Sequence, residues 1–196
     1  LKSILRTLRS AVSNNVETSV ALGDNPRSKL ALELASLAEE LAVTYVKLGS
    51  LGFGSVNDAT KTYRDLKECF RDLKFVAVAY ADYEVVRCLS PINVLNAAYR
   101  SDYDVVMIDT LIKNGRSTFD YLSPNEVKKV KDSAHDRGML FALAGSLQPK
   151  HVSLVKRVDP DIVGFRSAAC DGDRVGGKVV RNRVELLVKT YGRQPL

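Results

Sequence analysis

The sequence predicts an α/β protein of the (β/α)8 TIM-barrel class, in which six βα units are evident. Short apolar runs alternate six times with helical patterns along the chain, which indicates parallel strands covered by helices. Polar residues close most of these runs, at the edge where barrels carry their chemistry. The residues in question are Asp24, Lys47, Asp82, Asp109, Ser146 and Arg166.

The chain begins with an amphipathic helical pattern over residues 1–12, which no strand precedes. The clearest later helix start has Ser123 as N-cap, Pro124 at the first helical position and Glu126 completing a capping box. The predicted strands are 17–22, 44–49, 75–80, 104–109, 140–144 and 162–166, and the other predicted helices are 29–41, 56–71, 91–99, 150–157 and one ending at 189.

Two architectures fit this alternation, an open doubly wound sheet and a closed barrel. A dinucleotide-binding doubly wound sheet requires G-x-G-x-x-G after its first strand, and Gly52 and Gly54 supply only a fragment of that motif. The barrel accounts better for the polar strand ends. We therefore predict a single barrel domain over residues 1–196. The strand count is the difficulty for this prediction, because six strands are found where a barrel has eight and a helix stands before the first of them.

Composition narrows the class of protein. Apolar residues make up 45% of the chain and charged residues 27%, as in ordinary globular domains. The net charge of +6 is dispersed, which favours small anionic molecules or weak contact with a polyanion and gives no specific argument for nucleic acid. No run approaches the roughly 18 apolar residues of a membrane span. Three widely spaced cysteines, Cys69, Cys88 and Cys170, indicate neither a disulfide framework nor a zinc site, and favour the cytoplasm.

Lys47 and the pair Asp109 and Lys113 are the candidate catalytic groups. Lys47 lies between Val46 and Leu48 in an apolar strand, and burial of an amine lowers its pKa, which suits it to imine formation or proton transfer. Alternatively, Lys47 is a structural lysine paired with Asp82 or Asp109, and Asp109 and Lys113 form an ion pair that closes a strand.

The last two predicted strands end in small residues that allow backbone N–H groups to face a ligand. Loops at these places in barrels commonly bind phosphate, and here a guanidinium is available as well. The alternative is that both loops are ordinary tight turns. No metal site is predicted, because Asp171 and Asp173 lack the remaining EF-hand spacing; His135, following a helix, and His151, starting one, are expected at the surface. The candidate phosphate-binding residues are Gly145, Ser146, Gly164, Arg166 and Ser167.

Five stretches in order resemble the (5-formylfuran-3-yl)methyl phosphate synthase family. They are YVKLG at 45–49, AYAD at 79–82, IDTLIK at 108–113, ALAGS at 142–146 and DIVGFRSAAC at 161–170, the last followed by GDR at 172–174. The resemblance implies a (β/α)8 barrel that condenses two molecules of glyceraldehyde 3-phosphate, with loss of one phosphate, into the furan precursor of methanofuran-type one-carbon carriers. No metal or organic cofactor is implied.

The resemblance also implies roles for single residues. Lys47 resembles the lysine that accepts a proton, while Asp109 and Lys113 match the polar pair that completes the site, with Asp82 a further catalytic candidate. The imine-forming lysine of the family lies at the end of the second strand, which we expect to precede Leu1. The resemblance thus implies that the six units found here are the third to the eighth, and that the domain over residues 1–196 is incomplete at its N-terminus. A barrel without two strands exposes apolar edges, so we expect either a preceding segment or a homo-oligomer to cover them.

Two other functions remain open from the sequence. One is a Schiff-base aldolase that acts on another sugar phosphate, since it needs the same lysines and phosphate loops. The other is a non-catalytic barrel relative that lacks the nucleophile and serves as a binding protein. Formation of a furan from glyceraldehyde 3-phosphate alone distinguishes the predicted synthase from both.

Overall fold

Six parallel strands form a single curved sheet in the computed structural model, which describes residues 2–13, 15–171 and 176–192. The strands follow one another across the sheet in chain order. This order is that of successive right-handed βα units. The strands are β1 (Ser19–Gly23), β2 (Tyr45–Gly49), β3 (Lys74–Tyr80), β4 (Val105–Asp109), β5 (Leu140–Leu143) and β6 (Ile162–Val163).

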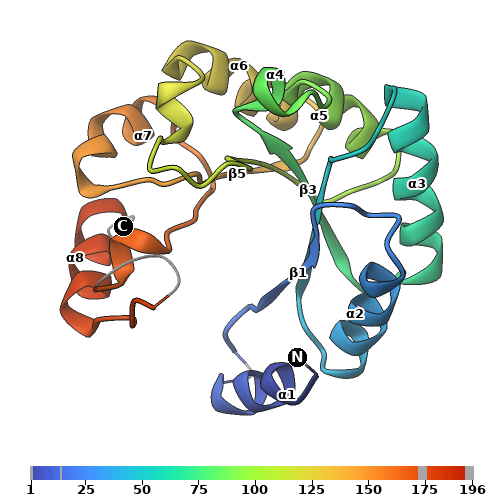
Figure 1. Ribbon diagram of the computed structural model, residues 1–196, viewed down its shortest axis with the longest axis horizontal. Coiled ribbons are helices and arrows are strands. Elements are labelled where there is room, and N and C mark those ends of the chain that lie inside the picture. Colours follow the sequence, from blue (N-terminus) through green and yellow to red (C-terminus); the bar gives the residue numbers. More distant parts are fainter. Residues whose placement is uncertain (1, 14, 172–175, 193–196) are drawn as a thin grey trace.

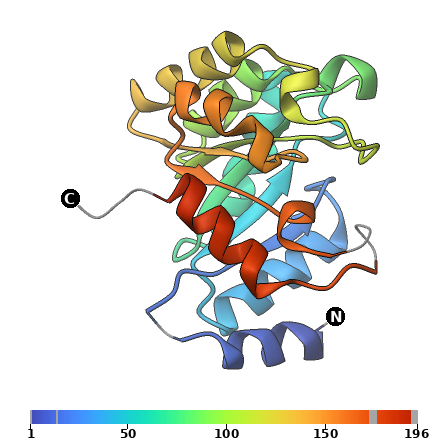
Figure 2. The same cartoon turned by 90° about the vertical axis from the view of Figure 1, so that its left-hand side faces the viewer.

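Helices surround the convex side of the sheet in an arc, with α1 beside the β1 end and α8 beside the β6 end (Figure 1). Figure 2 shows the same arrangement from the side of α8. The architecture is that of a partial (β/α)8 barrel containing six βα units. The α-helices are α1 (Lys2–Ala11), α2 (Lys29–Glu40), α3 (Val56–Cys69), α4 (Tyr83–Val86), α5 (Pro91–Tyr99), α6 (Pro124–His135), α7 (Val152–Val158) and α8 (Arg181–Tyr191), and the 3-10 helices are η1 (Thr118–Asp120), η2 (Pro149–His151) and η3 (Ser167–Ala169).

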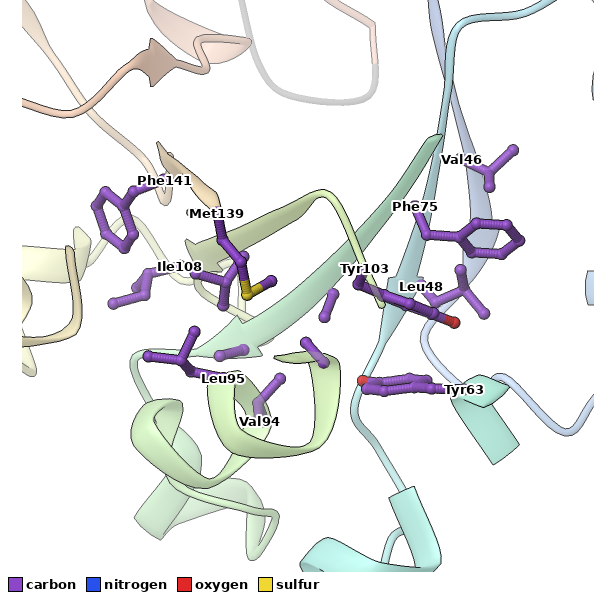
Figure 3. Packing of buried hydrophobic residues seen from close by; sticks show 14 of the residues in the cluster. Val46, Leu48, Tyr63, Phe75, Val94, Leu95, Tyr103, Ile108, Met139 and Phe141 are labelled. Carbon is purple, nitrogen blue, oxygen red and sulfur yellow. The ribbon is translucent and has the colours of Figure 1, made fainter. Parts of the chain in front are cut away.

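The two faces of the sheet have different surroundings. Alternate residues such as Val46, Leu48 and Ile108 pack outward against the helices in the main hydrophobic core (Figure 3). The intervening residues point to the concave face, where Val76, Val105 and Ala142 form a second, smaller apolar cluster together with Tyr45 and Met107. This alternation is the period of two expected of strands, and it places Lys47 on the concave face.

Most predicted elements are found within a few residues of the expected bounds. The predicted strand 162–166 is wrong in length, because only Ile162 and Val163 pair with β5 and the backbone at Arg166 turns into η3. His135 is the last residue of α6 rather than a residue after it, and its Nε2 lies 2.8 Å from Asp161 Oδ2. Among the described helices, none has the length and apolar character needed to cross a bilayer.

Candidate active site

Lys47 occupies the middle of β2 rather than its end. In the parallel ladders it lies opposite Ala21 of β1 and Val76 of β3. Its half-buried position on the concave face lowers the pKa of its amine, because burial disfavours the ammonium form, while the negative charge of Asp109 partly opposes this shift. A lowered pKa makes a neutral amine available closer to neutral pH, which nucleophilic attack and proton abstraction both require.

Asp109 and Lys113 form an ion pair at the end of β4. Lys113 Nζ donates to Asp109 Oδ1 at 2.7 Å and to Thr110 Oγ1 at 3.2 Å. The two side chains are 24% and 30% exposed. An ion pair with this much solvent access contributes only about 0.2–1 kcal/mol to stability. The pair therefore leaves two opposite charges accessible to a ligand. A ligand that separates Lys113 from Asp109 would lower the stability of the fold only slightly.

The loop after β5 is shaped by two residues with positive φ. Gly145 has φ of 96° and Ser146 has φ of 49°. Thr118 fixes this loop from η1, because its hydroxyl donates to the carbonyl of Ala144 at 2.7 Å and its N–H donates to the carbonyl of Gly145 at 3.0 Å. Thr118 is fully buried. The loop is thus held in one conformation before any ligand binds.

The loop after β6 lies beside the Gly145 loop. Gly164 continues the ladder for one more bond, donating its N–H to the carbonyl of Leu143 at 2.8 Å. A Cβ on Gly164 would lie 3.1 Å from Ala144 Cβ, so the glycine permits the segments that follow β5 and β6 to approach each other closely. The exposed Arg166 then precedes η3, which begins at Ser167.

These groups converge on one pocket of about 220 Å³ on the concave face. All predicted site residues except Asp82 line it. The pocket combines a half-buried lysine, a carboxylate–ammonium pair and an arginine with two glycine-containing loops, which is a set suited to phosphorylated carbonyl compounds. The predicted residues that line the pocket are Lys47, Asp109, Lys113, Gly145, Ser146, Gly164, Arg166 and Ser167.

Asp82, the remaining catalytic candidate, does not line this pocket. It is 1% exposed, and its carboxylate accepts N–H groups from Leu111 at 2.9 Å and Ile112 at 2.8 Å. A buried carboxylate needs such partners. Asp82 therefore fixes the backbone that carries Lys113 and acts on the pocket through that loop.

Sequence patterns did not reveal Thr118, because it lies in a 3-10 helix of three residues, 26 positions along the chain from the Ala144 carbonyl that it holds. The stretch 172–174, which contributes to the family resemblance, lies outside the described residues.

Comparisons with known proteins identify a family and agree with the fold. Residues 1–188 match the family model described as 4-HFC-P synthase. A (5-formylfuran-3-yl)methyl phosphate synthase from Methanopyrus kandleri is 35% identical over 192 residues, covering 95% of this chain and 81% of the relative. The enzyme of that name from Methanosarcina mazei is 34% identical over 176 residues, covering 87% of this chain and 75% of the relative.

Two solved structures show the same fold at low sequence identity. One, titled "QR15, an Aldolase", has a TM-score of 0.63 and 14% identity and covers 80% of this chain and 71% of its own. The other, a deoxyribose phosphate aldolase from Aeropyrum pernix, has a TM-score of 0.60 and 13% identity and covers 84% and 67%. The family match extends over nearly the whole chain, and the relatives are named as synthases. The chain therefore belongs to the 4-HFC-P synthase family of enzymes.

Proposed function

We propose that this protein condenses two molecules of glyceraldehyde 3-phosphate into (5-formylfuran-3-yl)methyl phosphate through a lysine imine. The observation that carries the proposal is the single pocket in which the half-buried Lys47 amine, the Asp109–Lys113 pair and two loops suited to phosphate meet. Atom balance requires one inorganic phosphate and two water molecules to leave as the furan forms. The reaction thus needs proton transfer at several carbon and oxygen atoms, together with stabilisation of phosphate charge.

Each group in the pocket has a role in this scheme. An imine acidifies the carbon next to the former carbonyl, and a neutral Lys47 amine accepts the proton from that carbon. In this scheme the imine forms on a lysine other than Lys47, as the family resemblance implies. Lys113 and Asp109 bind the oxygen atoms that leave as water and exchange protons with them. The loops at Gly145 and Gly164, together with Arg166, bind the phosphate that the product retains.

The proposal is tested by incubating the enzyme with glyceraldehyde 3-phosphate alone. We expect absorbance of a conjugated furan aldehyde to rise together with free phosphate, in equal molar amounts. A carbon–carbon adduct that retains both phosphates would indicate instead an aldolase of the more general Schiff-base type. Absence of any reaction, with retained phosphate binding, would indicate a non-catalytic relative.

Arg166→Ala is expected to raise the KM for the phosphorylated substrate by about tenfold or more, since a charge-assisted hydrogen bond to phosphate contributes about 1.5–3 kcal/mol. The inhibition constant of inorganic phosphate should rise in parallel. Arg181→Ala is the matched control, because the Arg181 side chain is 92% exposed on α8. Equal phosphate inhibition in the wild type and in Arg166→Ala would mean that the β6 loop is only a turn.

The homo-oligomer stays a prediction. Exposed apolar residues at both ends of the arc support it: Ile4 and Leu8 on α1 are each 58% exposed, and Val188 on α8 is 64% exposed. Apolar surface of this kind commonly marks an interface. Sedimentation of the enzyme as a monodisperse monomer would contradict it.

A further inference from the structure

A second pocket, of about 280 Å³, adjoins the first on the side of β1 to β3. Its lining includes Asp24, Gly49, Tyr80 and Thr110, none of which lines the first pocket. The two pockets share four residues: Lys47, Met107, Asp109 and Lys113. The candidate catalytic groups Lys47, Asp109 and Lys113 therefore lie at the boundary between the two pockets. This arrangement suits a reaction that joins two molecules, because each pocket can hold one molecule next to the reacting groups.

A hydrogen-bonded pair, Tyr80 and Asp24, is the distinctive feature of the second pocket. The Tyr80 hydroxyl donates to Asp24 Oδ1 at 2.6 Å. Burial and the neighbouring carboxylate raise the pKa of Tyr80, so the hydroxyl keeps its proton and remains a donor. The tyrosine is 2% exposed, whereas Asp24 is exposed. A buried donor thus fixes the orientation of an accessible carboxylate.

Gly49 leaves the space in which Tyr80 and Asp24 meet. Tyr80 ends β3 and Asp24 follows β1, so β2 lies between them in the sheet. Contact across β2 is feasible because that strand ends in Gly49: a Cβ there would overlap the Tyr80 hydroxyl and the backbone of Asp24. The glycine is required by close approach of neighbouring groups rather than by its own backbone angles.

The charges of the two pockets differ. The first contains Lys47, Lys113 and Arg166 against the single carboxylate of Asp109. The second contains the same two lysines but two carboxylates, Asp24 and Asp109. A phosphate close to Asp24 would be repelled. Within the described part of the chain, Asp24 Oδ2 has no hydrogen-bond partner, which leaves this oxygen able to accept a hydrogen bond from a donor such as an alcohol hydroxyl.

We infer that the second pocket binds the hydroxyl-bearing end of the second hydroxyaldehyde phosphate, with Asp24 accepting a hydrogen bond from the substrate hydroxyl and Tyr80 holding that carboxylate in place. The inference rests on the proposed function and assigns its second substrate molecule. The phosphate of this molecule points toward the shared lysines, away from Asp24. Asp24 is thereby a residue that selects substrates with a hydroxyl next to the carbonyl, and Tyr80 is a positioning residue.

Calorimetric titration of the full chain with glycerol 3-phosphate tests this assignment without turnover. The wild type is expected to bind two molecules per chain, and to bind inorganic phosphate at one site. In Asp24→Asn and in Tyr80→Phe, the affinity at one glycerol 3-phosphate site should fall by about tenfold, while the affinity for inorganic phosphate is unchanged. Asp65→Asn and Tyr83→Phe are matched controls, since Asp65 is exposed on α3 and the Tyr83 hydroxyl donates to the exposed residue Glu84 at 3.1 Å, outside both pockets.

The outcomes separate this inference from the proposed function. One bound glycerol 3-phosphate in the wild type, or two with unchanged affinity in Asp24→Asn, would overturn the second subsite even if the enzyme makes the furan. Two sites that respond to Asp24 in an enzyme that makes no furan would support the subsite and refute the proposed product. In the furan assay, Tyr80→Phe should raise KM with little change in kcat. A loss of stability with unchanged KM would mean that Tyr80 is purely structural.

Discussion

Turnover is expected to fall by a factor on the order of one hundred or more when Lys47 is replaced by arginine. Arginine keeps the positive charge and a similar length but cannot lose its proton in a protein. Burial lowers the pKa of the Lys47 amine, and the negative charge of Asp109 only partly opposes this. The neutral amine that accepts a proton is therefore present in the wild type and absent in Lys47→Arg, while phosphate binding is retained.

Steady-state rates of furan formation measure this effect, and Lys74→Arg is the matched control. Lys74 begins β3 with its side chain 50% exposed and its Nζ 3.8 Å from Glu17, so the same substitution there should leave turnover near normal. Substrate trapping by borohydride on another lysine should survive in Lys47→Arg. Near-normal turnover in Lys47→Arg would remove Lys47 from proton transfer and make Lys113 the candidate base.

The lowered pKa of Lys47 also fixes the direction of two pH dependences. Turnover should rise with pH through this pKa, since the amine is the active form and the ammonium is inactive. The free energy of unfolding should show a contribution of the same sign. Between the lowered pKa and the ordinary value of 10.5, the unfolded chain binds more protons at this lysine than the folded chain does. In that window the contribution to stability therefore rises with pH, and Lys47→Arg should abolish it.

The sequence was informative where local chemistry decides structure. The capping box was predicted from three residues and is present: the Ser123 hydroxyl accepts the N–H of Glu126, and the Glu126 carboxylate accepts the N–H of Ser123 at 2.8 Å. The buried strands could be found because residues with both faces covered form apolar runs. The single lysine within such a run, Lys47, stood out for the same reason.

Tertiary contacts account for what the sequence did not reveal. Asp82 follows a strand just as Asp109 does, and only the fold shows that it accepts two N–H groups inside the protein. Helix α4 was missed because its four residues are too few for a helical period. The link between Tyr80 and Asp24 joins residues 56 positions apart, and no pattern in one sequence encodes such a pairing.

Gly145→Ala is expected to weaken phosphate binding by about tenfold or more and to lower the free energy of unfolding by about 2–4 kcal/mol. Two costs combine. Alanine at a φ of 96° is strained, and its Cβ would overlap the Thr118 hydroxyl while lying 3.1 Å from the backbone nitrogen of Thr110. Displacement of that hydroxyl would leave the buried Ala144 carbonyl without its 2.7 Å donor, at a cost of about 1–3 kcal/mol.

Gly138→Ala separates the two costs. Gly138 has a comparable φ of 72°, but a Cβ there meets nothing within 4 Å, and it precedes β5 at the opposite end of the strand from the pocket. This control should lose only about 1 kcal/mol, with phosphate affinity unchanged. Urea denaturation and phosphate titration of both variants measure the difference. If Gly145→Ala behaves like Gly138→Ala in both experiments, the loop does not need its tight packing on Thr118. A Gly145 loop displaced by alanine could no longer direct its N–H groups at a bound anion. Unchanged phosphate affinity in Gly145→Ala would therefore mean that Arg166 and the lysines hold the phosphate without this loop.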